Sequence, residues 1–333
     1  MKKISVIGMG SWGTTLAILL AEKGFSVNGW EWMERYARAM QRERENKLFL
    51  PNCAFPENLK VTNNLNETVS FADIIVIAVP SQFVRKTISK IRNELKCKHI
   101  ISVTKGMEAD TLMRMSEVII QETGAVPENV SVLSGPTHAE EVSKKLPATI
   151  VAVSINEKLA KEVQRIFMTD YFRVYTSSDI IGVELGAALK NVIAIGAGIA
   201  DGMKLGDNSK AALITRGLRE ITRLGVKCGA NPHTFSGISG IGDLIVTCES
   251  RHSRNRFVGE QLAKGKTLKE ITDSMEMIAE GIKTTQAAYK LSKKMNVEMP
   301  ITNEIYNILF NEFSPQEGLK RLMTRSAKSE DEF

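Results

Sequence analysis

Lys190 is the side chain whose surroundings best suit proton transfer. It lies within Gly182–Asp201, GVELGAALKNVIAIGAGIAD, where Glu184 and Lys190 alone carry charge between Gly182 and Ala200. Apolar residues recur at helical intervals and small residues fill the gaps, so the stretch predicts a closely packed helix. An ammonium held in such a place has a lowered pKa and can exchange protons near neutral pH. Alternatively, the lysine stem snorkels to the surface.

A glycine-rich turn at the start of the chain provides a second kind of chemistry. Gly8-Met-Gly10-Ser-Trp-Gly13 lies between a β-type run, Ile4–Ile7, and an apolar helical segment, Thr14–Lys23. In a strand–turn–helix unit, the first glycine permits the tight turn, the second lets a pyrophosphate approach and the third lets the helix pack. We therefore predict dinucleotide binding at this turn, including Ser11 and Trp12. A plain tight turn is the alternative.

Glu31 follows the second predicted strand, about 20 residues past the glycine turn, where an acid binds the ribose hydroxyls of NAD. No basic residue follows until Arg35. A 2′-phosphate beside Glu31 would meet like charge, so the sequence favours NAD over NADP. The alternative is a solvated residue at the end of a strand, with Arg35 available for a phosphate.

Further polar groups follow predicted strands or turns. Lys105, in Thr-Lys-Gly, is predicted at the carboxyl end of a strand, where open α/β sheets bind ligands. His138 is either a proton-transfer group or, in the interpretation we favour, a structural or solvent-facing residue. Ser250–Arg256 gathers Arg, Ser and Asn side chains that suit a dianionic phosphate, although such a cluster is often only a solvated basic loop.

The elements that must position these residues divide the chain into two parts. Alternating strands and helices through about residue 178 predict a Rossmann-like, doubly wound and mostly parallel sheet over residues 1–179, followed by an all-α domain over 180–333. Further strands are expected at Ser26–Trp30, Asp73–Pro80, His99–Val103, Val130–Leu133, Ala148–Val153 and Phe172–Tyr175. Helices of the first domain are expected at Met33–Glu45, Ser81–Leu95, Thr111–Glu122, near His138 and at Glu157–Phe167, with a loop at Asn46–Asn58.

Helical signals dominate the second part. They predict helices at Ser209–Leu224 capped by Asn208, at Leu268–Met275 opened by a Thr267/Glu270 capping box, and at Thr284–Met295 and Ile301–Phe310. The polar end, Ser326–Phe333, is predicted to fray. The helix carrying Lys190 begins this domain, so we expect it where the two domains meet.

Composition excludes several classes of protein. The 333 residues are 43% hydrophobic and 25% charged, with a net charge of +6 and no dense basic block, which suits an anionic small molecule better than a nucleic acid. The short apolar run near the amino terminus breaks at Gly8, so neither a secretory leader nor a membrane span is expected and the protein should be cytoplasmic. Cys53, Cys97, Cys228 and Cys248 form no CxxC pair, which argues against a zinc site or a disulfide framework.

Seven motifs, taken together, indicate a resemblance to a known family of enzymes. They are GMGSWGT at Gly8, TKG at Thr104, SGPTHAEE at Ser134, GVELGAALKN at Gly182, GDNSKAALITRGL at Gly206, GDLIVTC at Gly242 and HSRN at His252. In content and order they resemble NAD(P)-dependent glycerol-3-phosphate dehydrogenase of the soluble bacterial type, over nearly the whole chain. The chain departs from many bacterial members at Glu31-Trp32-Met33, where a His-Arg type pair is common.

The resemblance implies roles for named residues. Lys190 is the catalytic acid/base, with Lys105 and Asp243 beside the reacting groups and no metal. The residues expected at the substrate are Lys105, Gly135, Thr137, Lys190, Asp243, Ser253, Arg254 and Asn255. Those expected at the cofactor are Gly8, Gly10, Ser11, Trp12, Gly13, Glu31, Lys105, Ala139, Arg254, Ile278 and Glu280.

The expected reaction interconverts sn-glycerol 3-phosphate and dihydroxyacetone phosphate with NAD or NADP. The resemblance also suggests a homodimer and the supply of glycerol phosphate for phospholipid synthesis. Two other readings remain open: a related dehydrogenase acting on a hydroxy acid or phosphogluconate, and a dinucleotide-sensing module without turnover.

Overall fold

A computed structural model of the protein describes residues 2–275 and 277–330. These residues form two compact units, one made of residues 1–104 and 115–180 and the other of residues 105–114 and 181–333. The short segment Lys105–Arg114 therefore belongs with the second unit, although the chain before and after it belongs with the first. An isolated bridge pairs Met107 with Arg114 inside this segment.

The first unit is built on an eight-stranded sheet in the order β10-β9-β8-β7-β6-β1-β2-β5. All neighbouring pairs are parallel except β8 and β9, which are antiparallel. The central strands read as continuous apolar runs, such as IIVI in β6, because both faces of the sheet are covered by helices. The predicted fold class, a doubly wound and mostly parallel sheet followed by a helical part, is confirmed.

The strands of the first unit are β1 Lys3–Ile7, β2 Ser26–Trp30, β3 Glu45–Asn46, β4 Leu50–Ala54, β5 Leu59–Thr62, β6 Ile74–Ile77, β7 His99–Ser102, β8 Val130–Ser134, β9 Ala148–Val153 and β10 Phe172–Ser177. Its helices are α1 Ser11–Glu22, α2 Glu34–Glu43, α3 Leu65–Phe71, α4 Ser81–Ile88, α5 Arg92–Leu95, α6 Met115–Thr123, α7 Ala139–Val142 and α8 Glu157–Phe167.

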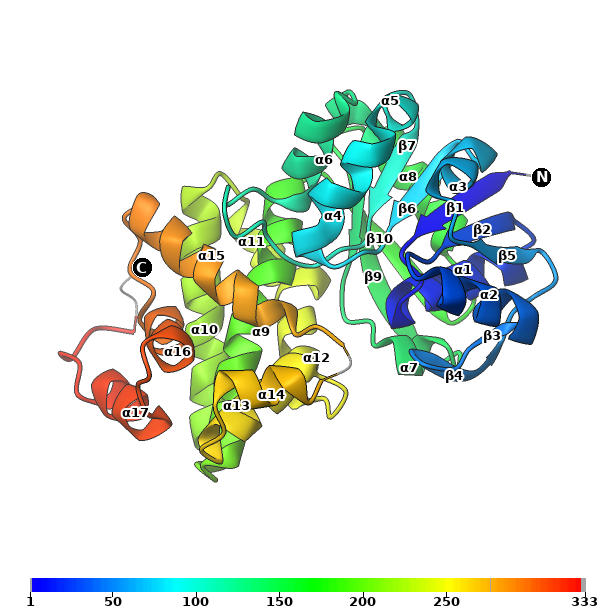
Figure 1. Cartoon of the computed structure of the whole chain (residues 1–333). Coiled ribbons are helices and arrows are strands. Elements are labelled where there is room, and N and C mark those ends of the chain that lie inside the picture. Colours follow the sequence, from blue (N-terminus) through cyan, green and yellow to red (C-terminus); the bar gives the residue numbers. More distant parts are fainter. Residues whose placement is uncertain (1, 276, 331–333) are drawn as a thin grey trace. The chain divides into compact units, whose positions relative to one another are not determined.

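Apart from the segment Lys105–Arg114, the regular elements in the described part of the second unit are helices, namely α9 Ile180–Gly202, α10 Gly206–Lys227, α11 Pro232–Phe235, α12 Asp243–Glu249, α13 Arg254–Ala263, α14 Leu268–Asp273, α15 Glu280–Lys294, α16 Pro300–Phe310 and α17 Pro315–Met323. A π-helical turn, Ile238–Gly242, precedes α12. Helix α9 is buried along almost its whole length, with α10, α13 and α15 of the same unit around it (Figure 1).

Glycines let the backbones of α9 and α13 touch. A Cβ added at Gly198 would lie 1.9 Å from the carbonyl oxygen of Arg256, and one at Gly259 would lie 2.0 Å from that of Ile195. Neither position has room for a side chain. The small residues of the Gly182–Asp201 stretch thus fix how closely α13 approaches the helix that carries Lys190.

Several predicted elements differ from the structure. The expected loop at 46–58 contains the antiparallel pair β3 and β4, and neither β5 nor α3 was predicted. The helix expected over Thr111–Glu122 begins only at Met115, because residues 105–114 form the bridged segment with Leu112 at a positive φ of 64°. The long helix expected over 81–95 is broken by a 3₁₀ turn, Ser89–Ile91.

Helix boundaries in the second unit were predicted with mixed success. Asn208 lies inside α10, which begins at Gly206 without a side-chain cap, so the predicted cap is wrong. The capping box of Thr267 and Glu270 at α14 is confirmed. Of the end predicted to fray, residues 331–333 lie outside the described residues. The part that is described includes Lys328, whose ammonium lies 3.0 Å from Glu298.

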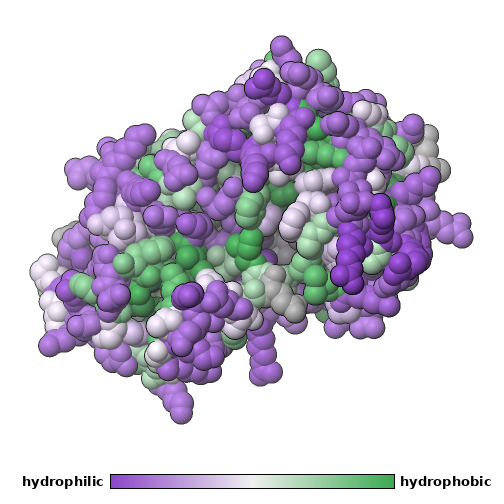
Figure 2. All heavy atoms as spheres, viewed as in Figure 1, coloured by the Kyte–Doolittle hydropathy of each residue, from purple (hydrophilic) through white to green (hydrophobic). Residues whose placement is uncertain are grey.

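Helix α9 is long and apolar enough to cross a membrane by length and composition, but 89% of its most apolar window is buried inside the protein. That degree of burial is typical of a core helix. On the face drawn in Figure 2, hydrophilic side chains are widespread, with smaller hydrophobic groups between them.

Candidate active site

Lys190 is buried in the second unit and donates hydrogen bonds to two side chains of α12. Its ammonium contacts Asp243 Oδ1 and lies 2.8 Å from Thr247 Oγ1. The side chain of Lys190 is only 5% exposed, so the snorkelling alternative does not describe this structure. Thr247 in turn donates to the carbonyl oxygen of Asp243 at 2.6 Å, which fixes the orientation of its hydroxyl.

Lys105 reaches the same carboxylate from the bridged segment. Its Nζ lies 2.9 Å from Asp243 Oδ2, and its side chain is 20% exposed. The buried Asp243 therefore accepts from one lysine on each oxygen. Two cations around one anion leave a net positive charge, which favours an anionic ligand or a developing alkoxide.

Burial lowers the pKa of Lys190 to about 7. Asp243 opposes this shift because its negative charge favours the ammonium, whereas the positive charge of Lys105 adds to it. A pKa near 7 allows Lys190 to act as an acid and as a base at neutral pH. The sequence predicted a lowered pKa for a lysine held in this packed helix, and desolvation is the largest cause of the shift.

A buried ion pair anchors the segment that carries Lys105. Arg114 Nη1 lies 2.6 Å from Glu184 Oε2 of α9, and the two side chains are 14% and 4% exposed. Met107, also in this segment, is 1% exposed within the apolar core of the second unit. Sequence reasoning missed this pair, although Glu184 was the one acidic residue in an otherwise apolar stretch.

The predicted phosphate-binding residues lie at the start of α13. Ser253 is the N-cap of α13, and its Oγ accepts a hydrogen bond from the N–H of Arg256 at 3.3 Å. Arg254 is the first residue of the helix, and its side chain is exposed. Helix N-termini attract anions because their first N–H groups lack helical partners. Arg254 also donates to the carbonyl oxygen of Ile278 at 2.8 Å, which links two residues predicted to touch the cofactor.

Asn255 occupies a more internal position than predicted. Its Nδ2 donates to Asn191 Oδ1 at 2.9 Å, and its Oδ1 accepts from the N–H of Gly281 at 2.9 Å. The side chain therefore joins α9, α13 and the start of α15, where Glu280 is the first residue. In this structure Asn255 holds Asn191 beside Lys190, and the predicted contact with substrate stays a prediction.

The glycine turn lies between β1 and α1 in the first unit. Gly8 has a positive φ of 105°, and a Cβ added at Gly13 would lie 1.9 Å from the Gly8 carbonyl oxygen, so both glycines are required by the backbone. A Cβ at Gly10 would meet no atom within 4 Å. The open space at Gly10, in front of a 12-residue helix, fits the pyrophosphate of a dinucleotide.

Ser11 and Trp12 form the first turn of α1. Trp12 packs against Phe172, with ring centroids 6.3 Å apart, and its buried Nε1 has no hydrogen-bond acceptor among the described residues. Ala139 begins α7, and its carbonyl oxygen lies 3.4 Å from Thr15 Oγ1 of α1. The predicted cofactor residues Ser11, Trp12 and Ala139 are thus gathered around one helix start.

Glu31 stands at the end of β2, as predicted, but its carboxylate is turned inward. It is 3% exposed, and Oε1 accepts from the N–H of Met33 at 3.1 Å. Burial raises the pKa of Glu31. A ribose hydroxyl would have to share this carboxylate with the backbone at the start of α2.

Gly135 and Thr137 follow β8. A Cβ at Gly135 would lie 2.9 Å from Ile150 Cα of β9, and Thr137 donates from Oγ1 to the Gly135 carbonyl oxygen at 3.2 Å. His138 is the N-cap residue of α7 without a side-chain cap. The close approach of β9 explains why a glycine is needed at position 135. Contact of Gly135 and Thr137 with the substrate stays a prediction.

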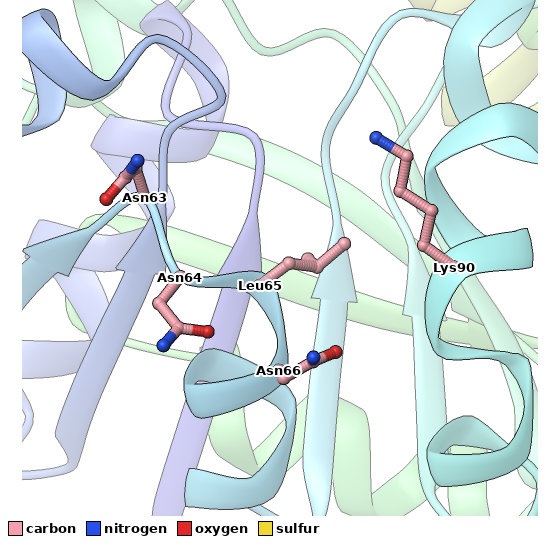
Figure 3. A pocket seen from close by; sticks show the side chains of 5 residues that line it. All are labelled: Asn63, Asn64, Leu65, Asn66 and Lys90. Atoms are coloured by element: carbon pink, nitrogen blue, oxygen red, sulfur yellow. The ribbon is translucent and has the colours of Figure 1, made fainter.

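Two surface hollows of the first unit lie outside this set of residues. One of about 440 Å³ is lined by Asn63, Asn64, Leu65, Asn66 and Lys90, from the start of α3 and the turn after α4 (Figure 3). Asn64 is engaged as the cap of α3, accepting from Glu67 N at 3.1 Å. The hollow carries no carboxylate or imidazole, so it offers no acid–base pair. The other, of about 280 Å³, lies beside α1.

Comparison with known proteins identifies the family. The model described as NAD-dependent glycerol-3-phosphate dehydrogenase N-terminus matches residues 3–160, and the one described as NAD-dependent glycerol-3-phosphate dehydrogenase C-terminus matches residues 179–320. This chain belongs to the NAD-dependent glycerol-3-phosphate dehydrogenase family.

Relatives of this family match the chain over nearly its whole length. A protein of Chlorobium limicola named glycerol-3-phosphate dehydrogenase (NAD(P)+) is 50% identical, covering 98% of this chain and 99% of the relative. The crystal structure of glycerol-3-phosphate dehydrogenase from Coxiella burnetii is 38% identical with a TM-score of 0.94, covering 97% and 99%. One from Saccharomyces cerevisiae is 27% identical with a TM-score of 0.81, covering 96% and 98%.

Among the described residues, no group of three or more His, Cys, Asp or Glu side chains is placed to hold a metal ion. The buried Cys248 follows Thr247 in α12, and burial raises the pKa of its thiol to about 12. Cys248 is therefore a packed, protonated thiol.

Proposed function

We propose that this chain interconverts sn-glycerol 3-phosphate and dihydroxyacetone phosphate, with Lys190 as the general acid and base. The observation that carries the proposal is the Lys105–Asp243–Lys190 cluster, in which a buried lysine with a pKa of about 7 shares a carboxylate with a second lysine. The names of the relatives, glycerol-3-phosphate dehydrogenases, support the same reaction.

The turn at Gly8–Gly13 and the start of α1 would hold the cofactor, which supplies or accepts a hydride at the substrate C2 carbon. In the reducing direction, the Lys190 ammonium donates a proton to the C2 oxygen as that oxygen gains negative charge. In the oxidising direction, neutral Lys190 takes the proton from the C2 hydroxyl. The ammonium of Lys105 stabilises the alkoxide character of the oxygen.

Asp243 keeps the two ammonium groups together despite their mutual repulsion. Because Lys190 and Lys105 donate to different oxygens, the carboxylate fixes both nitrogens at once. Thr247 adds a neutral acceptor for Lys190 at 2.8 Å. Arg254 and the first N–H groups of α13 bind the phosphate of the substrate, since a planar guanidinium can donate two parallel hydrogen bonds.

We further propose NAD as the preferred cofactor, because Glu31 places an acid at the end of β2. Initial rates with NADH and NADPH at equal concentrations test this point. A strong preference for NADPH would contradict it and would point to Arg35, which is exposed on α2.

A cytoplasmic homodimer that supplies glycerol phosphate for phospholipid synthesis completes the proposal. The homodimer rests on the family resemblance. Light scattering after size exclusion measures the mass: about twice that of the 36.8 kDa chain is expected, and a single chain would contradict the dimer.

The activity is tested by following the absorbance of reduced nicotinamide after dihydroxyacetone phosphate and NADH are mixed with the protein. Loss of NADH with formation of glycerol 3-phosphate is expected. Turnover of a hydroxy acid or of phosphogluconate without turnover of dihydroxyacetone phosphate would favour a related dehydrogenase. Binding of NADH without turnover of any of these would favour a sensing module.

A further inference from the structure

Asn46 is a fully buried side chain in β3 that the functional prediction did not include. Its Nδ2 donates to the carbonyl oxygen of Met9 and to Thr14 Oγ1, both at 2.7 Å. Its Oδ1 accepts from the N–H of Phe49 at 2.9 Å and from the Tyr36 hydroxyl. Both donor hydrogens and both acceptor positions of the amide are therefore used.

These hydrogen bonds converge on the middle of the glycine turn. Met9 lies between Gly8 and Gly10, and its carbonyl oxygen also accepts from Thr14 Oγ1 at 3.0 Å. The chain has no cis peptide bond among the described residues, and a trans peptide directs its C=O and its N–H to opposite sides. With the Met9 carbonyl held toward Asn46, the Gly10 N–H points the other way.

There is free space beside the Cα of Gly10. A Cβ at Gly10 would meet nothing within 4 Å, and the Gly10 carbonyl oxygen accepts from Thr14 N at 2.9 Å to begin α1. Asn46 and Thr14 thus fix one peptide plane at the start of α1. Oriented backbone N–H groups at such a start bind phosphate oxygens well only when they point at the ligand.

We propose that Asn46 is a positioning residue for the cofactor: by holding the Met9 carbonyl inward, it aims the Gly10 N–H and the start of α1 at the pyrophosphate of the dinucleotide. This inference rests on the proposed dinucleotide binding at the turn. Through Tyr36 and Phe49, the same side chain ties the turn to α2 and to the connection between β3 and β4.

The test measures the affinity of the Asn46→Asp variant for NADH, with quenching of protein fluorescence as the readout. Aspartate keeps an acceptor for Phe49 and Tyr36 but removes both donors and places an oxygen against the Met9 carbonyl. We expect the Kd of NADH to rise at least about tenfold. A factor of this size corresponds to the loss of one or two hydrogen bonds between the backbone of the turn and the pyrophosphate. ADP-ribose, which has the pyrophosphate but no nicotinamide, should lose the same factor.

A matched control separates positioning from general loss of stability. Asn58 also donates from Nδ2 to two backbone carbonyls, those of Ala21 and Phe25, each at 2.7 Å, but at the opposite end of α1. Asn58→Asp should lower the thermal midpoint and leave the Kd of NADH within about twofold of the wild type. At saturating NADH, Asn46→Asp should keep the KM for dihydroxyacetone phosphate.

A second pair of variants covers the case in which Asn46→Asp does not fold. Thr14→Val keeps the shape of Thr14 but removes the hydroxyl that bonds Met9 and Asn46, whereas Thr14→Ser retains it. We expect Thr14→Val to weaken NADH binding several-fold and Thr14→Ser to restore it.

A folded Asn46→Asp variant that binds NADH as tightly as the wild type would overturn the positioning role. Equal affinities of Thr14→Val and Thr14→Ser would do the same. A wild-type protein that binds neither NADH nor ADP-ribose would instead overturn the proposed function on which this inference rests.

Discussion

Lys105 and Lys190 donate hydrogen bonds to opposite oxygens of the same carboxylate, that of Asp243. The two lysines are far apart in the sequence, one in the bridged segment and one in α9. Their joint position gives the site an excess positive charge beside a buried amine whose pKa is about 7.

Removal of the Lys190 amine should abolish proton transfer without removing the cofactor site. We expect Lys190→Ala to lower turnover of dihydroxyacetone phosphate by about 10²–10⁴ while the Kd of NADH is retained. Partial recovery on addition of ethylamine would show that the lost group is the amine. Turnover near that of the wild type would contradict the assignment of Lys190 as the acid.

The pH profile should move in opposite directions when the two neighbours of Lys190 are changed. In the wild type, kcat/KM for ketone reduction should fall as the pH rises through about 7, because the acid form is lost. Asp243→Asn removes the charge that raises this pKa, so the fall should begin at lower pH. Lys105→Met removes the charge that lowers it, so the fall should begin at higher pH.

Lys227→Met is the control for this pair, since Lys227 is an exposed lysine in the last turn of α10. Its profile should coincide with that of the wild type. Shifts of the same sign in Asp243→Asn and Lys105→Met would contradict the electrostatic account.

Arg254 should report on the substrate phosphate. We expect Arg254→Gln to raise the KM for dihydroxyacetone phosphate about 10–100-fold, because the charge-assisted pair between the guanidinium and the phosphate is lost. The slow reduction of unphosphorylated dihydroxyacetone should change little. Arg251→Gln, at an exposed neighbour, should leave both unchanged. A separate Kd for NADH measures any contribution of Arg254 to the cofactor. Equal losses for the two ketones would place Arg254 away from the phosphate.

Glu220 of α10 should stabilise the second unit by capping α16. Its carboxylate accepts from the N–H groups of Ile301 at 2.6 Å and Thr302 at 3.1 Å. Glu220→Ala leaves these donors buried without an acceptor, so we expect a loss of about 1–3 kcal/mol in the free energy of unfolding by urea. Glu304→Ala, a less buried acid on α16, should cost much less.

The contribution of Glu220 should depend on pH in a stated direction. Burial raises its pKa from 4.5 to about 7, so the folded protein binds this proton more tightly than the unfolded chain does. The stability linked to that proton is fully present below about 4.5 and is lost as the pH rises through about 7. The difference between wild type and Glu220→Ala should therefore narrow from about pH 5 to about pH 8. A difference that widens over that range would contradict the raised pKa.

Sequence alone predicted the elements whose patterns are long and regular. The range of α8, Glu157–Phe167, is reproduced without change because its helical period is clear, and the range of the short strand β2, Ser26–Trp30, is reproduced as well. Strand β3 spans two residues, too few to show a period, so the β3–β4 pair was read as a loop. The role of Asn46 could not be inferred because its hydrogen bonds join residues 32 and 37 positions away along the chain.

The site was predicted as residue types rather than as an arrangement. The resemblance placed Lys190, Lys105 and Asp243 beside the reacting groups, but only the structure shows that both lysines donate to the two oxygens of Asp243. Nothing in the spacing showed that Asn255 would bond Asn191, or that Glu31 would turn inward, since both depend on where neighbouring backbone N–H groups lie.

The path of the chain also limits how the protein can be taken apart. The chain leaves the first unit after Thr104, returns at Met115 and leaves it again after Ile180. A gene fragment ending at residue 180 encodes Met107 without the helices that bury it, and a fragment beginning at 181 lacks Lys105. Recombination at a single point therefore cannot exchange the second unit for that of a relative. A working exchange has to transfer the segment Lys105–Arg114 together with the helices that follow residue 180.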